Sequence, residues 1–447
     1  MIGEPMRVGG GPMQVGELDS PRFGWIWMVP YFLLLYCRID FFGAQLAGEG
    51  GADDGALKMA IEAFSYAIAG LLILARLDEV KPLFAAMLPF ILYTIYAGFT
   101  AAWSDYPESV LLRVGHMIGL GLVAIAAGAW SMQKRSSIFY FTAAFMLAVL
   151  IMSVLCVVFL PQRGLVTDLT GVQFEGARWI GITGHPNLLG AVAMAGIWTA
   201  IAIQYFNKQW WVRVMAWSTI GLAIVALIGS DSRTSMFSSA FLVVVLLLLH
   251  ARNPVGPGEF FKRVAVLSAV LGVVIGAVYI VSPDFVSSHM SFGTRAGASN
   301  SLSDRNLIWA YGIEAFKDHP MGWSYDLLQT YWDSHGKLAL FPHFHDGYLD
   351  VAVKGGVVAE MLLFWILVRI GWSIGRLYHR DYQLFALHAA FFASLLVYNL
   401  AETGFDREAL LWPFMIVAWV SVEALNIRLE GETSMVAPDF RPRPDIS

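Results

Sequence analysis

Charged residues are scarce in this chain. Only 14% of its 447 residues are charged, whereas 57% are hydrophobic; a soluble protein of this length would carry about 25% charged residues. The composition excludes an ordinary soluble enzyme of two or three domains and predicts a polytopic membrane protein. The formal net charge is only -5, and no basic tract is present, so the sequence predicts no nucleic-acid partner.

Cysteine is almost absent as well. Cys37 and Cys156 both lie in apolar segments, which argues against a disulfide framework and against a thiolate metal site. Residues 1–22 are polar and contain no apolar signal-peptide core, so the first apolar helix is expected to remain as an uncleaved anchor. No internal repeat is visible, and an inverted-repeat transporter therefore gains no support.

Apolar runs dominate the rest of the chain. A membrane-spanning helix needs about 20 mostly apolar residues, and twelve segments of this kind are expected: 24–43, 59–75, 83–103, 109–131, 138–160, 187–206, 210–229, 234–250, 264–282, 353–373, 384–401 and 409–427. The predicted fold is an all-α polytopic bundle. It divides into a polar N-terminus (1–22), nine helices (23–282), a long polar loop (283–352), three helices (353–427) and a disordered tail (428–447).

Lys and Arg occur in alternate loops, as the positive-inside rule requires. Lys134 and Arg135 lie in one inner loop, and Lys208 and Arg213 lie in the next, whereas the intervening loops are poorer in Lys and Arg and more acidic. Both termini are therefore expected in the cytoplasm of a bacterium, with the protein in the inner membrane. The 283–352 loop is expected on the opposite side, which is the periplasm in a Gram-negative cell.

Seven basic side chains would then share the outer face. Arginine on this face runs against the charge bias, which indicates an anionic ligand. The seven are Arg163, Arg178, His185, Arg233, Arg305, His343 and His345.

The first motif runs from Arg178 to Gly190. Asn187 follows Pro186 at the expected start of the sixth span, where its side chain would cap the helix. Such a helix end also favours anions. His185 suits either a catalytic role or a structural hydrogen bond.

The second motif is the Ser230–Ser235 turn. Arg233 would lie at the outer end of the eighth span, where an arginine needs a partner. Either it pairs with Asp231, or its guanidinium fork binds phosphate oxygens.

The third motif predicts an amphipathic helix outside the membrane, from about 303 to 317. Ser303 or Asp304 would start it, and Trp309 belongs to its apolar stripe. Arg305 would lie in the first turn, either paired with a nearby acid or bound to an anion.

The fourth motif places two histidines together at residues 343–350. Three roles remain open: a metal site formed by His343, His345, Asp346 and Asp350, a structural histidine pair, or a proton acceptor. The spacing fits no regular zinc pattern. Asp350 and Lys354 are spaced i, i+4 and can pair simply to enter the membrane.

These motifs resemble those of the O-antigen ligase and Wzy-type polymerase superfamily, which includes exopolysaccharide polymerases. That family is similar in having about twelve spans, a large outer loop late in the chain, and a His followed by Asn, Ser or Gln. A Gly then lies eleven residues after the His, and a small residue fourteen after it. Here these positions are His345, Asp346, Gly356 and Ala359. Asp346 replaces the usual amide or hydroxyl, and residues 399–402 match a weaker family feature.

The resemblance implies a metal-independent, inverting glycosyltransferase without a cofactor. Arg233 and Arg305 would bind the pyrophosphate of a polyprenyl-diphosphate-linked glycan, and His345 would act on the acceptor hydroxyl. Further candidates for substrate binding are Arg163, Arg178, His185, Asn187, Trp309, His343 and Asp346. The expected partners are this lipid-linked glycan and membrane lipids, with a chain-length regulator and a flippase as further candidates.

Two alternatives to a polymerase of oligosaccharide repeats stay open. One is an O-antigen ligase that transfers the lipid-linked glycan to lipid A core or to protein. The other is a flippase for the same lipid, which would need polar residues within its spans; the main ones present are Glu62 and His388.

Overall fold

The computed structural model describes residues 24–39, 51–134, 136–169, 172–250, 301–326, 328–335, 343–405 and 410–436. The expected N-terminal segment 1–22 and the expected ninth span, 264–282, lie outside these residues. In chain order the elements are η1 (Gly24–Met28), α1 (Val29–Arg38), α3 (Gly51–Ala75), α4 (Leu77–Ala86), α5 (Leu88–Phe99), η2 (Thr100–Ala102), α6 (Pro107–Gln133), α7 (Ser137–Phe159), α8 (Pro161–Gly164), β1 (Leu165–Leu169), β2 (Val172–Trp179), α9 (Pro186–Phe206), α10 (Trp210–Ser230), α11 (Arg233–His250), α14 (Ser301–Asp318), α15 (Gln329–Ser334), α16 (Gly347–Arg376), α17 (Tyr382–Tyr398) and α18 (Leu411–Val436).

The predicted all-α polytopic fold is confirmed. Among the described residues, seven helices are long and apolar enough to cross a membrane: α3, α6, α7, α9, α10, α16 and α18. The pair α4 and α5, bent by 72°, counts as an eighth span if it is one broken helix, and shorter apolar helices end at Arg38, Leu249 and Tyr398. Each expected span that falls on described residues therefore coincides with an apolar helix, although the total of twelve is not established.

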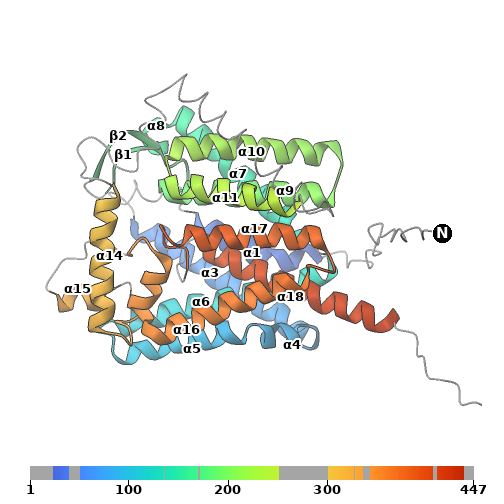
Figure 1. Ribbon diagram of the computed structural model, residues 1–447, viewed down its shortest axis with the longest axis horizontal. Coiled ribbons are helices and arrows are strands. Elements are labelled where there is room, and N and C mark those ends of the chain that lie inside the picture. The colour runs from blue at the N-terminus through green and yellow to red at the C-terminus, as the bar shows by residue number, and fades with distance from the viewer. Residues whose placement is uncertain are drawn as a thin grey trace, which may run out of the picture.

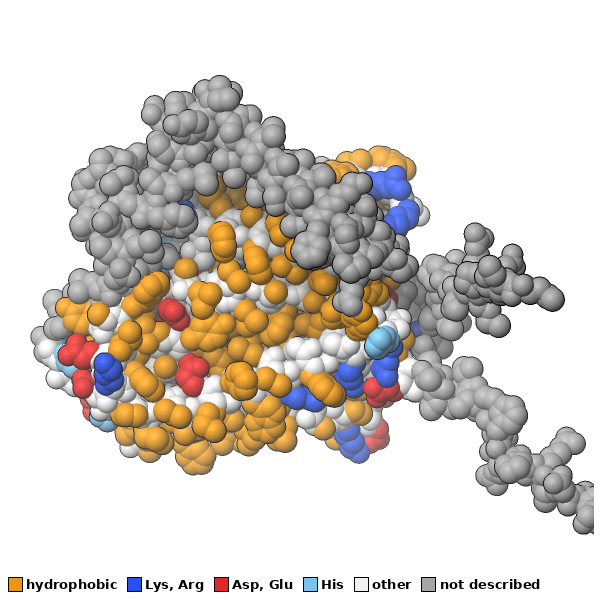
Figure 2. All heavy atoms as spheres, in the orientation of Figure 1, with side chains coloured by type: hydrophobic (Ala, Val, Ile, Leu, Met, Phe, Trp, Pro, Cys, Tyr) orange, Lys and Arg blue, Asp and Glu red, His pale blue; other side chains and the backbone are white. Residues whose placement is uncertain are grey.

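The long helices run alongside one another, and α14 lies across one end of the bundle (Figure 1). We call this end the α14 end. Figure 2 shows hydrophobic side chains covering the middle of one face, with charged side chains gathered towards both ends. This distribution is the one expected of a bundle whose apolar waist faces lipid.

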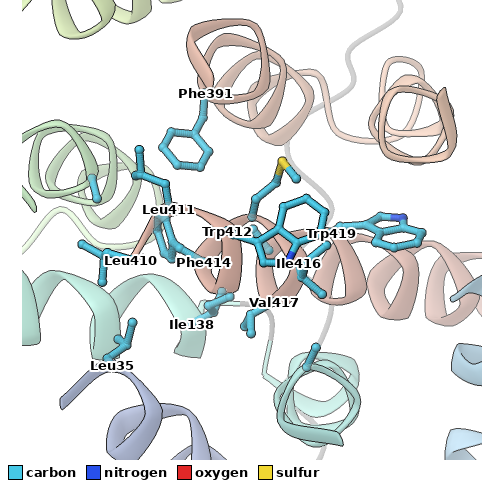
Figure 3. Close-up of a cluster of buried hydrophobic side chains, with 14 of the residues drawn as sticks. Leu35, Ile138, Phe391, Leu410, Leu411, Trp412, Phe414, Ile416, Val417 and Trp419 are labelled. Carbon is cyan, nitrogen blue, oxygen red and sulfur yellow. The ribbon is translucent and has the colours of Figure 1, made fainter. Parts of the chain in front are cut away.

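The C-terminal helix α18 forms the centre of the core. Within its apolar window 89% of the residues are buried, compared with 22% for α3 and 33% for α10. The ring of its Phe414 packs against Phe391 of α17, with the ring centroids 5.2 Å apart (Figure 3), and its Trp419 indole N–H donates to the Ser373 hydroxyl of α16 at 3.2 Å. Because lipid is as apolar as these side chains, close packing rather than transfer from water stabilises such a helix.

The tenth predicted span differs from expectation in two ways. Helix α16 begins at Gly347 rather than at 353, because the Asp346 side chain caps it. It is also broken at Gly356, whose φ of 63° is left-handed. The Val357 N–H, freed by the break, donates to the Pro320 carbonyl at 2.9 Å. The chain after α14 is thereby fixed against the middle of α16.

Three smaller expectations also change. Helix α14 begins at Ser301, so Arg305 lies in its second turn rather than in its first. Helix α18 continues to Val436, so residues 428–436 extend a helix where disorder was expected. Strands β1 and β2 form an antiparallel hairpin that was not expected, with Val166 paired to Arg178.

Candidate active site

The N-termini of two helices meet the 399–405 segment, which follows α17, at the α14 end. From α9, the Asn187 amide donates to Glu402 Oε2 at 2.6 Å. From α11, the Thr234 hydroxyl lies 3.5 Å from the Ala401 carbonyl. The two helices also touch each other: a Cβ added at Gly190 would lie only 2.5 Å from a side-chain oxygen of α11.

A third helix N-terminus, that of α16, joins the same segment. The Gly347 N–H donates to the Asn399 carbonyl at 2.8 Å. Asp346 caps the helix by accepting the N–H groups of Tyr348 and Leu349 at 2.9 and 3.0 Å. Burial raises the pKa of the Asp346 carboxyl, although both hydrogen bonds oppose this rise. Three helix N-termini with their positive dipole ends therefore converge on one segment, an arrangement that favours an anion.

His345 and Glu402 form the polar centre of this region. The His345 Nδ1 lies 3.0 Å from Glu402 Oε1, and the side chains are 26% and 5% exposed. An ionised carboxylate only accepts hydrogen bonds, so it fixes the imidazole proton on Nδ1 and leaves Nε2 able to accept a proton. Asn187 holds the other carboxylate oxygen. His345 has a left-handed φ of 52°, which costs a non-glycine residue about 1–3 kcal/mol.

His343 supports this pair. Its side chain is buried, and its Nδ1 accepts the His345 backbone N–H at 3.3 Å. The two imidazole rings lie 4.2 Å apart, centroid to centroid, and the Thr403 hydroxyl lies 3.4 Å from the same Nδ1. His343 therefore helps to hold the loop that carries His345.

A cavity of about 350 Å³ opens beside Glu402. Its volume lies at the lower end of the range typical of small-molecule sites. Its lining includes both polar and apolar side chains, so it suits a ligand with both hydroxyl groups and a C–H face. The polar lining consists of His185, Asn187, His343, Glu402 and Thr403, and the remainder of Leu188, Ala191, Tyr398, Gly404, Leu410 and Leu411.

The expected cap of α9 is wrong. His185, not Asn187, is the N-cap residue, and its Nδ1 accepts the Asn187 backbone N–H at 3.1 Å. Proline at the first helical position leaves Asn187 at the second, with its side chain turned towards Glu402. Both residues nevertheless line the cavity.

Two arginines near the start of α11, Arg233 and Arg178, have different surroundings. Arg233 is the first residue of α11 and is partly exposed at the α14 end. Arg178 donates from Nε to the Ser230 carbonyl at 2.9 Å and from Nη2 to the Asp231 carbonyl at 3.0 Å. It thus places a cation at the C-terminus of α10, where the helix dipole favours one. Arg178 therefore holds the turn that precedes Arg233.

The other candidates lie on peripheral elements. Arg163 is exposed on the short helix α8. Arg305 belongs to α14, but its side chain is not among the parts of the chain that the structure describes. Trp309, one turn later, has a buried indole N–H without a hydrogen-bond partner among the described residues. Helix α14 lies against the histidine loop, because a Cβ at Gly312 would come within 2.9 Å of Phe344.

Three side chains could hold a metal ion. One ligand atom from each of His343, His345 and Glu402 lies within 4.8 Å of the other two. This set differs from the one considered from the sequence, because Asp346 caps α16 and Asp350 pairs with Lys354. In both histidines Nδ1 already makes a hydrogen bond, so a metal would have to use Nε2 or displace these bonds.

Glu402 is the site residue that sequence reasoning missed. The sequence matches the 399–402 segment only to a weak family feature and does not indicate a role for Glu402. Its one signal was an acidic residue at the end of an apolar span. The contact with His345 joins positions 57 residues apart, and spacing along the chain cannot reveal it.

The His-Asp-Gly-Ala spacing now has a structural reason. The residue after the histidine is the N-cap of α16, a position that suits Asn, Ser and Asp alike. Gly356 adopts the left-handed φ at the helix break, where a Cβ would meet the Pro320 carbonyl. Ala359 is fully buried, and a Cβ added at Gly355 would lie only 2.3 Å from the Ala359 Cβ, so the two positions pack too closely for a larger residue at 355.

Known proteins match the part of the chain that contains several of these site residues. The O-antigen ligase family model matches residues 218–364, which include Arg233, His345 and Gly356. The chain is also similar to the exopolysaccharide production protein ExoQ of Rhizobium meliloti (strain 1021), with 26% identity over 208 residues. That match covers 42% of this chain and 45% of the relative, so the chain spans less than half of that protein. With the motif around His345, these matches support the resemblance of the chain to the O-antigen ligase and Wzy-type polymerase superfamily.

Proposed function

We propose that this membrane enzyme polymerises polyprenyl-diphosphate-linked oligosaccharide repeats on the periplasmic face of the inner membrane. The observation that carries the proposal is the His345–Glu402 pair, which lies where three helix N-termini meet, beside a cavity. Both the relative's name and the residue pattern favour exopolysaccharide synthesis.

The donor of the reaction is anionic. Its pyrophosphate would lie at the N-termini of α9, α11 and α16, with Arg233 and Arg305 as its guanidinium ligands. These groups stabilise the negative charge that grows on the leaving phosphate oxygen as the bond to the anomeric carbon breaks. No step of this kind requires a metal ion.

The acceptor is a sugar hydroxyl of a second lipid-linked repeat. Its ring would occupy the cavity beside Glu402, and His345 Nε2 would take the hydroxyl proton as the oxygen attacks the anomeric carbon. The leaving pyrophosphate keeps the electron pair of the broken bond. Glu402 stabilises the imidazolium that forms, and a direct displacement inverts the anomeric centre.

Two other activities use the same substrate. A ligase would transfer the glycan to lipid A core or to protein, and a flippase would only move the lipid across the membrane. A chain-length regulator and a flippase would be natural partners of a polymerase, because one sets product length and the other supplies the donor.

Reconstituted protein separates these activities. We expect vesicles that contain the pure protein and one lipid-linked repeat to yield a ladder of longer lipid-linked glycans. Product that forms only after lipid A core or an acceptor protein is added would instead establish a ligase. Transfer of the labelled lipid between leaflets without a new glycosidic bond would overturn both and establish a flippase.

A further inference from the structure

A buried ion pair lies on α16, one helical turn after the Asp346 N-cap that follows the histidine loop. Lys354 Nζ pairs with Asp350 Oδ2 within the first turns of α16, and the side chains are 2% and 0% exposed. Burying two charges is costly, and apolar residues of the same size often serve stability as well or better. Entry of α16 into the membrane, the simple role expected from the sequence, does not require this pair.

The second oxygen of Asp350 suggests what the pair does. Asp350 Oδ1 accepts the backbone N–H of Phe344 at 3.1 Å, six residues earlier in the chain. Phe344 lies between the two histidines, and its ring is fully buried. The carboxylate therefore connects the helix to the backbone just before His345.

This connection bears on a strained residue. His345 has a left-handed φ of 52°, and such a conformation persists only where its surroundings hold it. The Gly347 N–H and the Asp346 cap fix the chain after His345. The bond from Asp350 fixes the chain before it, and Lys354 holds the carboxylate in place. Together these contacts set the distance between His345 Nδ1 and Glu402.

We propose that Asp350 is a positioning residue for His345. Its hydrogen bond to the Phe344 N–H holds the histidine loop in the geometry that presents Nε2 to the acceptor hydroxyl, whereas Lys354 neutralises the buried carboxylate. This inference rests on the function proposed above, in which His345 is the proton acceptor. The hydrogen bond from the Phe344 N–H to Asp350 then has a role in turnover that is separable from stability.

Two double variants isolate the bond to Phe344. Asp350→Asn with Lys354→Met removes both charges but keeps an oxygen that can accept the Phe344 N–H. Asp350→Leu with Lys354→Met removes the charges and the acceptor, with side chains of similar size. Neither leaves an unpaired buried charge, so both are expected to fold.

We expect the Asn/Met protein to retain activity within about 3-fold of wild type. The Leu/Met protein should lose about 10- to 100-fold in kcat, because small misplacements of a catalytic group cost this much. Its KM for the lipid-linked repeat should change by less than about 3-fold. Hydrogen exchange of the Phe344 amide should speed up in the Leu/Met protein only.

Equal kcat values in the two double variants, or equal exchange at Phe344, would overturn the inference. His345→Ala, measured in the same assay, separates this failure from that of the proposed function. If His345→Ala is inactive and the two double variants are alike, only the positioning role is wrong. If His345→Ala retains full activity, the proposed role of His345 is wrong and the positioning role is overturned with it.

Discussion

Two histidine–carboxylate pairs in this chain have almost the same contact but different surroundings. His345 Nδ1 lies 3.0 Å from Glu402, and His116 Nδ1 lies 2.9 Å from Glu62. Glu62 also pairs with Arg38 at 2.8 Å, and the Tyr66 hydroxyl lies 3.2 Å from His116 Nδ1. We call these the Glu402 pair and the Glu62 pair.

On the proposed function, the surroundings distinguish a reactive pair, the Glu402 pair, from a structural one, the Glu62 pair. The Glu62 pair joins two helices, α3 and α6, and a cation on α1 neutralises the acid within the bundle. This is how a membrane protein accommodates a buried charge. The Glu402 pair joins two loops at helix N-termini, and Glu402 lines a cavity. A histidine beside a carboxylate is therefore not evidence of a site until an anion-binding environment and an open space accompany it.

The largest expected difference between the pairs concerns the histidines. His345→Ala should lower kcat for polymer growth by about 10²- to 10⁴-fold, because it removes the proton acceptor. His116→Ala, the matched control, should stay within about 3-fold of wild type. The rate of glycan elongation by purified protein measures both. Similar losses in the two variants would remove the distinction between the pairs.

The second difference concerns the carboxylates. Glu402→Gln should reduce kcat by about 10- to 100-fold with little change in thermal stability, because a neutral amide no longer stabilises the imidazolium. Glu62→Gln should instead lower stability by about 3–5 kcal/mol, since it breaks a buried pair with Arg38. Turnover rates and thermal unfolding midpoints, measured on the same preparations, test whether Glu402→Gln mainly lowers activity and Glu62→Gln mainly lowers stability. A stable Glu62→Gln protein with lost turnover would contradict it.

A smaller effect is expected at Asp346, which caps α16 beside the Glu402 pair. Burial raises its pKa in the folded protein, so the contribution of this group favours folding at low pH. That contribution is lost as pH rises from the ordinary aspartate pKa through the raised one. Asp346→Asn keeps the cap and cannot ionise, so its stability relative to wild type should increase with pH across this window. Its activity should remain within about 3-fold, and a relative stability that falls with rising pH would oppose this interpretation.

Metal removal should have the smallest effect. Glu402 and the histidine Nδ1 atoms are already hydrogen-bonded to one another or to the backbone, and arginines with helix N-termini supply the positive charge. Prolonged treatment with EDTA should therefore leave polymer growth unchanged. Loss of activity that a divalent ion restores would instead indicate that His343, His345 and Glu402 bind a metal.

The sequence predicts the bundle well and the site only in part. Apolar runs of about 20 residues locate the spans. The charge bias of the loops predicts His185, Arg233 and His345 on one face, and in the structure the starts of α9 and α11 and His345 all contact the 399–405 segment. Contacts between distant segments are not predictable in this way. The bond from Glu402 to His345 depends on how α16 and α17 pack.

The predicted cap of α9 and the predicted start of α16 both differ from the structure. Asn187 is the better intrinsic cap, yet His185 takes this role because Pro186 must occupy the first helical position. The predicted start at 353 lies six residues after the observed start of α16, because the apolar run begins only after Asp350, whereas Asp346 caps the helix earlier. In the structure Gly356 marks a break within the helix, and the chain near Pro320 satisfies the freed N–H.

A structure with a bound, unreactive polyprenyl-diphosphate analogue would show whether the lipid-linked substrate binds at the Glu402 pair. We expect the diphosphate at the N-termini of α9, α11 and α16, in contact with Arg233. The anomeric carbon should then face the cavity beside His345 and Glu402. A diphosphate bound at Arg38 and His116 instead, or at any place remote from His345, would exclude the proposed role of the Glu402 pair.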